Sequence, residues 1–368
     1  MKILIAGDWH SDTHEEPLAR ALASNGHELV RFAWHRYFRP EEPRGISGLV
    51  RDVAGRAQNK FLVGPAISNL NRDLVVLAQE TQPDAIFVYR GTHVRKGTLL
   101  VLHETLPQVT LVGYNNDDPF SPLQPHWAWR HFLAGVPAYD LVLAYRRHNV
   151  EEFRRAGARN VDVLRSWFIP EQHHPVVLDA ADIERFGCDV VFAGHFERDA
   201  RIRHLVALAE SGVKLRLFGP DWPRRLPPGL QALAPVRAVR GAEYVKALCG
   251  AKLALCFLSA RNRDTYTRRC FEIPATGTMM LSEFSEELAS MFEEGREAEF
   301  FRSPDELVRK ALAYLVDTQR RRAMAAAGRD RAMRDGHDVA SRARWLVWRI
   351  EEAVRGRCGI PFMRPGAA

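Results

Sequence analysis

The chain has 368 residues, of which 46% are hydrophobic and 26% charged, and its formal net charge is +7. This length exceeds one typical hydrophobic core and suits two, and the composition is that of a soluble globular protein. No run of about 18 apolar residues occurs, so no transmembrane helix is predicted, and the apolar run at residues 2–6 is too short for a signal peptide.

The positive net charge has two explanations. One is attraction to phosphate-bearing ligands or to an anionic membrane face, and the other is an arginine-rich solvated surface, which charge alone favours. No Lys/Arg block and no nucleic-acid-binding motif occurs, so no nucleic-acid partner is expected. The five cysteines are scattered and form no C-x-x-C pair. This pattern predicts a reduced, cytoplasmic setting without a cysteine-based metal site.

Strand and helix patterns alternate through the first half of the chain, which is typical of a parallel sheet covered on both faces. Strands are predicted at residues 2–6, 28–32, 85–89, 109–114, 141–145 and 161–164. Helices are predicted at residues 17–24, 70–79, 97–105 and 149–156. Residues 35–62 are rich in Arg, Pro and Gly and are predicted to be irregular. Weak peripheral membrane contact would fall on their Arg-rich part, 36–56, which has no clear amphipathic stripe.

A linker is predicted at 171–187, because Pro170 and Pro175 resist both helix and central strand. The alternation then restarts, with strands at residues 189–193, 214–218, 253–257 and 278–281 and helices at residues 202–209, 244–248 and 268–276. Ser303-Pro304-Asp305-Glu306 predicts a helix start, with Ser at the cap, Pro in the first turn and Glu three residues after the Ser.

The predicted organisation is therefore two α/β domains joined by the linker. Residues 1–170 form the first domain and 188–340 the second. A C-terminal helix and tail, 341–368, are expected to cross back to the first domain. Doubly wound domains of this kind bind ligands at the carboxyl ends of their strands, so the residues directly after predicted strands are the candidates for a site.

The most informative stretch is Asp264-Thr265-Tyr266-Thr267-Arg268-Arg269-Cys270-Phe271-Glu272-Ile273-Pro274-Ala275-Thr276-Gly277. Further elements follow it in order: Leu281-Ser282-Glu283, Met291-Phe292-Glu293-Glu294-Gly295, Glu299-Phe300-Phe301, the helix start at Ser303, and Ala327-Gly328. This ordered set resembles the C-terminal domain of CgeB-like glycosyltransferases, which are related to glycosyltransferase family 4. The resemblance covers about residues 188–346, and Asp117-Asp118-Pro119 in the first half is also similar to this group.

The resemblance implies a GT-B fold, in which two Rossmann-like domains face each other across a cleft. It also implies transfer of a sugar from a nucleotide-diphosphate sugar bound on the second domain. The acceptor would be a saccharide, a lipid-linked molecule, a protein or a small molecule. Because GT-B enzymes generally use no metal, neither a metal nor another cofactor is expected. Similarity to family 4 favours retention at the anomeric carbon.

In similar enzymes an acid-x7-acid pattern faces the donor, and Asp264 and Glu272 have that spacing. Asp264 would approach the transferred sugar, although it is one methylene shorter than the usual Glu. Glu272 would accept hydrogen bonds from the ribose hydroxyls. Arg268 and Arg269 lie between them, and a guanidinium matches phosphate oxygens and stabilises a leaving diphosphate. Arg268 and Glu272 are also four residues apart, so they could simply pair on a solvated helix face.

The other donor-side candidates would border the diphosphate or the base: Gly194, His195, Arg198, Tyr244, Thr276 and Gly277. Each also has a structural explanation. The segment from Gly194 to Arg198 has the features of an ordinary strand-to-helix turn, and Tyr244 suits core packing.

The first domain is expected to bind the acceptor. The loop after its first strand lacks G-x-G-x-x-G, so no dinucleotide fingerprint is present. Asp8 and His10 in that loop are candidates for the general base that an inverting transfer would need, but the residue types favour capping of the loop. The acceptor-side candidates after later strands are Arg90, His93, Asp117 and Asp118.

Two other functions stay open on the same scaffold. A sugar-nucleotide epimerase or hydrolase would share the donor site but lack an acceptor pocket. A non-catalytic partner protein would bind a nucleotide sugar without turnover. The nucleobase, the sugar and the acceptor depend on pocket shape rather than on motifs, so the sequence does not predict them.

Overall fold

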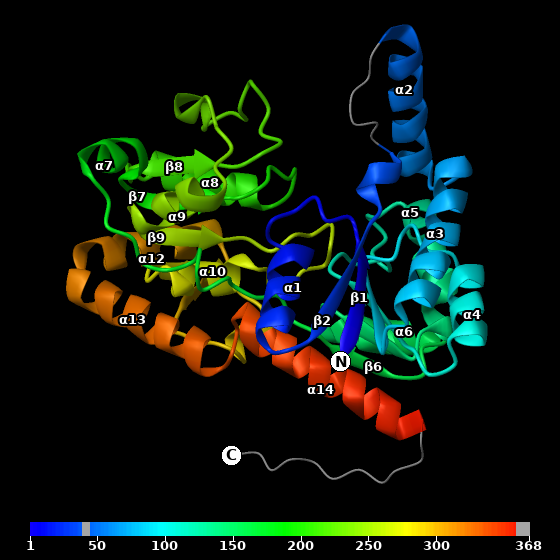
Figure 1. Ribbon diagram of the computed structural model, residues 1–368. Coiled ribbons are helices and arrows are strands. Elements are labelled where there is room, and N and C mark those ends of the chain that lie inside the picture. Colours follow the sequence, from blue (N-terminus) through cyan, green and yellow to red (C-terminus); the bar gives the residue numbers. More distant parts are fainter. Residues whose placement is uncertain (39–44, 358–368) are drawn as a thin grey trace. The chain divides into compact units, whose positions relative to one another are not determined.

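The computed structural model describes residues 1–38 and 45–357, with the backbone alone for residues 45–51 and 356–357 (Figure 1). The chain divides into two compact units. The first comprises Met1–Arg165 and Val339–Ala368, and the second comprises Ser166–Asp338. The segment 36–56, named above for membrane contact, falls largely on residues whose side chains lie outside this description. No described helix has the length and apolar character needed to cross a bilayer.

The first unit contains a six-stranded parallel sheet in the order β2-β1-β3-β4-β5-β6. Its strands are β1 (Lys2–Gly7), β2 (Glu28–Ala33), β3 (Ala85–Tyr89), β4 (Thr110–Asn115), β5 (Leu141–Ala144) and β6 (Val161–Val163). This is a doubly wound order, and the winding direction reverses between β1 and β3, where such sheets bind ligands beyond the carboxyl ends of the strands.

Within its described residues, the first unit also contains seven α-helices. They are α1 (Glu15–Ser24), α2 (Gly45–Phe61), α3 (Pro65–Thr81), α4 (Lys96–Thr105), α5 (His126–Gly135), α6 (Arg147–Arg155) and α14 (Val339–Arg357). Helix α14, the last of the described elements, packs against α1 and β4. The core contains the fully buried Leu4, Ile86, Leu111 and Phe132.

The prediction that residues 35–62 are irregular was wrong, because the region contains a short 3₁₀ helix, η1 (His35–Tyr37), and the long helix α2. The glycines of α2 lower its intrinsic helix propensity. One of them has a packing role, since a Cβ on Gly55 would overlap the carbonyl oxygen of Phe38. Helix α5 was not predicted.

The second unit has a five-stranded parallel sheet in the order β11-β10-β9-β7-β8. Its strands are β7 (Cys188–Ala193), β8 (Leu215–Phe218), β9 (Ala251–Cys256), β10 (Met279–Glu283) and β11 (Glu299–Phe301). When the strands are numbered within each unit, the strand order of the second sheet is the same as that of the first five strands of the first sheet. The winding direction reverses between β7 and β9.

The helices of the second unit are α7 (Ala180–Phe186), α8 (Arg201–Glu210), α9 (Gly241–Cys249), α10 (Arg269–Ala275), α11 (Glu286–Ala289), α12 (Pro304–Val316) and α13 (Thr318–Arg334). The segment 171–187, expected to be a linker, belongs to this unit and contains α7. The predicted helix start at Ser303 is confirmed, because the Ser303 hydroxyl accepts a hydrogen bond from the Glu306 backbone N–H at 3.2 Å.

Candidate functional site

Two glycine loops meet at the carboxyl edge of the second sheet. Gly194 follows β7 and donates its backbone N–H to the carbonyl of Phe218, the last residue of β8, at 2.8 Å. Gly219 follows β8 with a φ of 140°, and a Cβ there would overlap the Gly194 backbone. The two loops therefore pack backbone against backbone, an approach that only glycine allows.

Arg201, a buried residue that the sequence did not single out, anchors the loop after β7. Its guanidinium pairs with Asp199 at 2.7 Å and with Glu197 at 3.1 Å, and it donates to the His195 carbonyl at 3.0 Å. Its side chain is only 1% exposed. The sequence did not mark Arg201 as a candidate, because nothing distinguishes it there from the many other arginines of the chain.

Arg269, the first residue of α10, lies directly against Gly194. A Cβ on Gly194 would stand 3.3 Å from the Arg269 Cζ, so any side chain at position 194 would press on the guanidinium. The Arg269 Nε is buried and has no hydrogen-bond partner. Burial opposes the charge of Arg269, but nearby Cys256, Tyr244 and Glu272 outweigh it and raise the pKa of the guanidinium. The structure thus holds a cation with an unused donor at the point where the winding direction reverses.

Glu272 lies one turn further along α10 and is 6% exposed. Its Oε2 accepts a hydrogen bond from the Tyr244 hydroxyl at 2.8 Å. Its Oε1 lies 3.7 Å from the Nε2 of His173 and 3.9 Å from the Nε of Arg268. Burial, together with the charge of Glu272, raises the pKa of Tyr244 well above 10. Tyr244 is therefore a hydroxyl donor to a carboxylate.

His173 was not a candidate in the sequence, where it looks like linker surface, yet it is buried. Its Nδ1 accepts the backbone N–H of Ile169 at 2.9 Å. In the neutral ring the Nε2 must then carry the proton, and it is the Nε2 that lies nearest Glu272. Sequence spacing could not reveal that His173 lies near Glu272, because about a hundred residues separate the two.

Asp264 lies in the loop after β9 and forms hydrogen bonds within that loop. Its carboxylate accepts the backbone N–H of Ser259 at 3.3 Å, and its own N–H donates to the Ser259 carbonyl at 2.9 Å. The Ser259 hydroxyl in turn donates to Glu197 at 2.8 Å, which connects this loop to the loop after β7. The loops that follow β7, β8 and β9 are therefore joined at one edge of the sheet.

The remaining donor-side candidates differ in their surroundings. His195 pairs with Asp221 at 2.9 Å on the surface, and Arg198 is exposed. Thr276 and Gly277 lie at the opposite end of α10 from Arg269. The Thr276 hydroxyl donates to the Ile273 carbonyl at 2.7 Å, and Gly277 has a φ of 72°. These two residues end the helix, as a glycine with positive φ commonly does, and the structure does not bring them to the Gly194 loop.

In the first unit, the loop after β1 is held by Glu15, a buried acid that the sequence did not single out. The Glu15 Oε1 accepts the Asp8 backbone N–H at 2.9 Å, and a Cβ on Gly7 would overlap the same carboxylate. Burial raises the pKa of Glu15. The carbonyl of Asp8 contacts the His35 Nδ1 at 2.5 Å, and His10 is exposed.

The acceptor-side candidates of the first unit separate into two groups. Arg90, with a φ of 68°, pairs with Asp117 at 2.6 Å. His93 is instead a core residue. It stacks on Trp34, and its Nε2 lies 2.7 Å from the Asn59 side-chain oxygen. Burial lowers the pKa of His93 to about 3. The His93 ring is therefore enclosed, and its expected role toward an acceptor stays a prediction.

Comparisons with known proteins agree with the geometry of the second unit. Residues 198–347 match the glycosyl transferase-like family model. Among curated proteins, none matches this chain in sequence.

Several solved structures share the fold. Sucrose-phosphate synthase from Thermosynechococcus elongatus is similar with a TM-score of 0.69 and 14% identity, over 96% of this chain and 99% of that one. HepE from Anabaena, solved in complex with UDP and glucose, has a TM-score of 0.62 and 15% identity, over 96% and 100% of the two chains. A putative UDP-N-acetylglucosamine 2-epimerase from Listeria monocytogenes has a TM-score of 0.57 and 13% identity, over 99% of each chain.

Two doubly wound parallel sheets and these structural similarities identify the architecture. The protein has the GT-B fold of glycosyltransferases, as the sequence predicted. The family model that matches is described only as glycosyl transferase-like, so the CgeB-like assignment and the link to family 4 stay predictions.

Proposed function

We propose that the chain is a glycosyltransferase that moves a sugar from a nucleotide-diphosphate sugar, bound on the second unit, to an acceptor nucleophile. The single observation that carries the proposal is the Arg269 guanidinium. It lies against the Gly194 backbone with its buried Nε unpartnered, one helical turn from the buried carboxylate of Glu272. In a bound nucleoside diphosphate, the guanidinium would contact the diphosphate, and the carboxylate one turn away would contact the ribose.

Each residue then has a chemical role in the proposed reaction. Negative charge grows on the diphosphate as the sugar leaves, and a fixed guanidinium stabilises that charge more in the transition state than in the ground state. Arg269 and Arg268 would supply it. Glu272 would accept hydrogen bonds from the ribose hydroxyls through Oε1, because Oε2 is engaged by Tyr244. Asp264 would lie nearest the transferred sugar.

The acceptor would bind on the first unit. An inverting transfer would need a general base, and Asp8 or His10, in the loop after β1, would then take the acceptor proton. A hexosyl transfer with retention is the form favoured by the similarity to family 4 proteins. A reduced, cytoplasmic location suits the four described cysteines, which are free thiols: Cys188, Cys249, Cys256 and Cys270.

A sugar-nucleotide epimerase is a second candidate, because a putative UDP-N-acetylglucosamine 2-epimerase shares the fold over almost the whole chain. It would use the same donor site without an acceptor. Analysis of products from a labelled donor separates the two: transfer to an added acceptor, inversion at a sugar carbon, or capture by water. Donor binding without any product would favour the non-catalytic partner protein.

The experiment that tests the proposal is thermal-shift screening of the full chain against UDP, GDP, dTDP and CMP sugars, followed by titration of the preferred nucleotide. Ligand binding to the folded state raises its apparent stability. The variant Arg269→Ala is expected to weaken binding by roughly 10–100-fold, because a hydrogen bond to a charged group contributes about 1.5–3 kcal/mol.

Arg296→Ala is the matched control, since Arg296 in the same unit forms an exposed ion pair with Glu293. It should leave nucleotide binding unchanged. Equal nucleotide affinity in wild type, Arg269→Ala and Glu272→Gln, with all three folded, would refute the donor site.

A further inference from the structure

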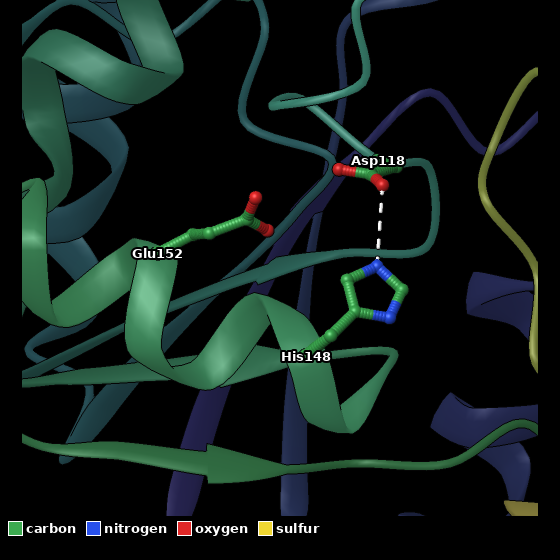
Figure 2. A group of neighbouring side chains, drawn as sticks. All are labelled: Asp118, His148 and Glu152. Atoms are coloured by element: carbon green, nitrogen blue, oxygen red, sulfur yellow. Dashed lines mark hydrogen bonds and ion pairs between the residues drawn. The ribbon is translucent and has the colours of Figure 1, made fainter.

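We propose that Asp118, His148 and Glu152 form a binding site for one divalent transition-metal ion in the first unit (Figure 2). The three side chains offer one imidazole nitrogen and two carboxylate oxygens, and these three atoms all lie within 4.8 Å of one another. The site stands on the first unit alone, so it does not depend on the proposed donor chemistry of the second.

Two local features of the fold bring the ligands together. Asp118 follows β4 and is fully buried. His148 and Glu152 are four residues apart near the start of α6, so they share one face of the helix. Figure 2 shows the Glu152 carboxylate and the His148 ring both directed toward Asp118. The cluster lies just beyond the carboxyl ends of β4 and β5, the edge at which sheets of this class bind ligands.

Asn149, a buried residue, orients both carboxylates. Its side-chain N–H₂ donates to the Asp118 Oδ1 at 2.9 Å and to the Glu152 Oε2 at 2.8 Å. The backbone N–H of Phe120 also donates to the Asp118 Oδ1, at 3.0 Å. Partners that hold the non-coordinating oxygen of a ligand carboxylate are a usual part of metal sites. The hydrogen-bond donors Asn149 and Phe120 thus fix the orientation of the carboxylates, which distinguishes this cluster from acids that are merely close together.

The distance between Asp118 and His148 fits two ligands of one ion. The Asp118 Oδ2 lies 3.4 Å from the His148 Nε2. A charge-assisted N–H···O bond is shorter, about 2.7–2.9 Å. In a tetrahedral site with metal–ligand bonds of about 2.1 Å, neighbouring ligand atoms are separated by about 3.4 Å. The ligand oxygen of Glu152 lies within 4.8 Å of both other ligand atoms.

The donor set favours one class of ion. Ca²⁺ and Mg²⁺ prefer oxygen ligands alone, whereas an imidazole together with carboxylates suits Zn²⁺, Co²⁺ or Mn²⁺. Three protein ligands leave the remaining coordination to water or to an oxygen of a bound molecule.

The test uses the full chain without a histidine tag, dialysed against a chelator. It is titrated calorimetrically with Zn²⁺, and with Co²⁺ while visible absorption is recorded, because the Co²⁺ bands report the ligand number. Wild type should bind one Zn²⁺ and give intense Co²⁺ bands. His148→Ala should lose at least 100-fold in affinity, and Asn149→Ala should lose roughly 10–100-fold, since partners of ligands usually contribute that much.

His103→Ala is the matched control. The His103 Nε2 lies 3.9 Å from the Asp140 carboxylate, and its side chain is 31% exposed, as is that of His148. His103 belongs to no three-ligand group among the described residues. His103→Ala should therefore bind like wild type. If Asp118→Asn fails to fold, the partly exposed His148 still provides the deciding variant.

Three results would overturn the proposal. One is the absence of Zn²⁺ or Co²⁺ binding to the folded wild type. Another is binding that persists unchanged in His148→Ala, which would mean adventitious surface binding. The third is a Co²⁺ spectrum that His148→Ala does not alter. Each of these would leave nucleotide binding by the second unit untouched.

Discussion

Buried polar side chains hold the loops at the carboxyl edges of the two sheets. Arg201 holds the loop after β7, Glu15 holds the loop after β1, and His173 lies beside Glu272. The sequence predicted Arg269 and Glu272 as site candidates through their place in an ordered motif. It could not predict that His173 lies 3.7 Å from Glu272, because a contact between residues far apart in the chain leaves no local pattern.

His93 gives a residue-scale prediction for the pH dependence of stability. Its folded-state pKa is about 3, whereas a free histidine has 6.5. The unfolded chain therefore takes up a proton as pH falls through 6.5, and the folded chain does not until near 3. The stability contributed by neutral His93 is complete above the ordinary pKa and is lost as pH falls. Between about pH 7 and about pH 4 the loss should be roughly 3 kcal/mol.

Urea unfolding of wild type and His93→Gln over this pH range checks the prediction. The difference in unfolding free energy between the two proteins should fall by roughly 3 kcal/mol from pH 7 to pH 4, because other groups contribute equally to both. His10→Gln is the control, since His10 is exposed. A pH-independent difference between wild type and His93→Gln would contradict the buried, neutral state of the ring.

At the scale of elements, short apolar runs predicted the position of nearly every strand, because a parallel strand buried on both faces is a continuous apolar run. Helix α2 was missed because its glycines lower helix propensity, while the packing of Gly55 on Phe38 comes from tertiary structure. Segment 171–187 contains α7, whose cap is formed by the Asp179 side chain accepting from the Asp182 N–H at 2.8 Å. A capped seven-residue helix is too short to give a clear period.

The start of α12 gives an element-scale prediction. The Ser303 hydroxyl accepts from the Glu306 N–H, while the Glu306 carboxylate accepts from the Arg302 N–H at 2.8 Å. Loss of the capping hydroxyl in Ser303→Ala should lower the unfolding free energy by about 1 kcal/mol. Ser24→Ala, at an exposed helix end, should change it by less than about 0.5 kcal/mol in chemical denaturation. An equal effect of the two substitutions would contradict the cap.

For the whole molecule, the two proposed sites lie in different units and should be separable by hydrogen exchange. A bound ligand slows exchange in the region that it stabilises. UDP is expected to slow exchange around the Gly194 loop and α10, and Zn²⁺ to slow it at α6 and at the Phe120 amide. Exchange in α12 is the internal reference. Protection by UDP confined to the first unit would contradict the assignment of the donor to the second.

The chain passes between the two units twice, after Arg165 and again after Asp338, and α14 then packs on α1 and β4. The second unit is thus an insertion within the first. During synthesis the ribosome releases the whole inserted unit before it releases α14. The residues of the first unit that α14 covers stay uncovered until α14 itself has been translated. The second unit, whose sequence is continuous, can complete its fold earlier, so the order of folding should run opposite to the order in which the two units begin.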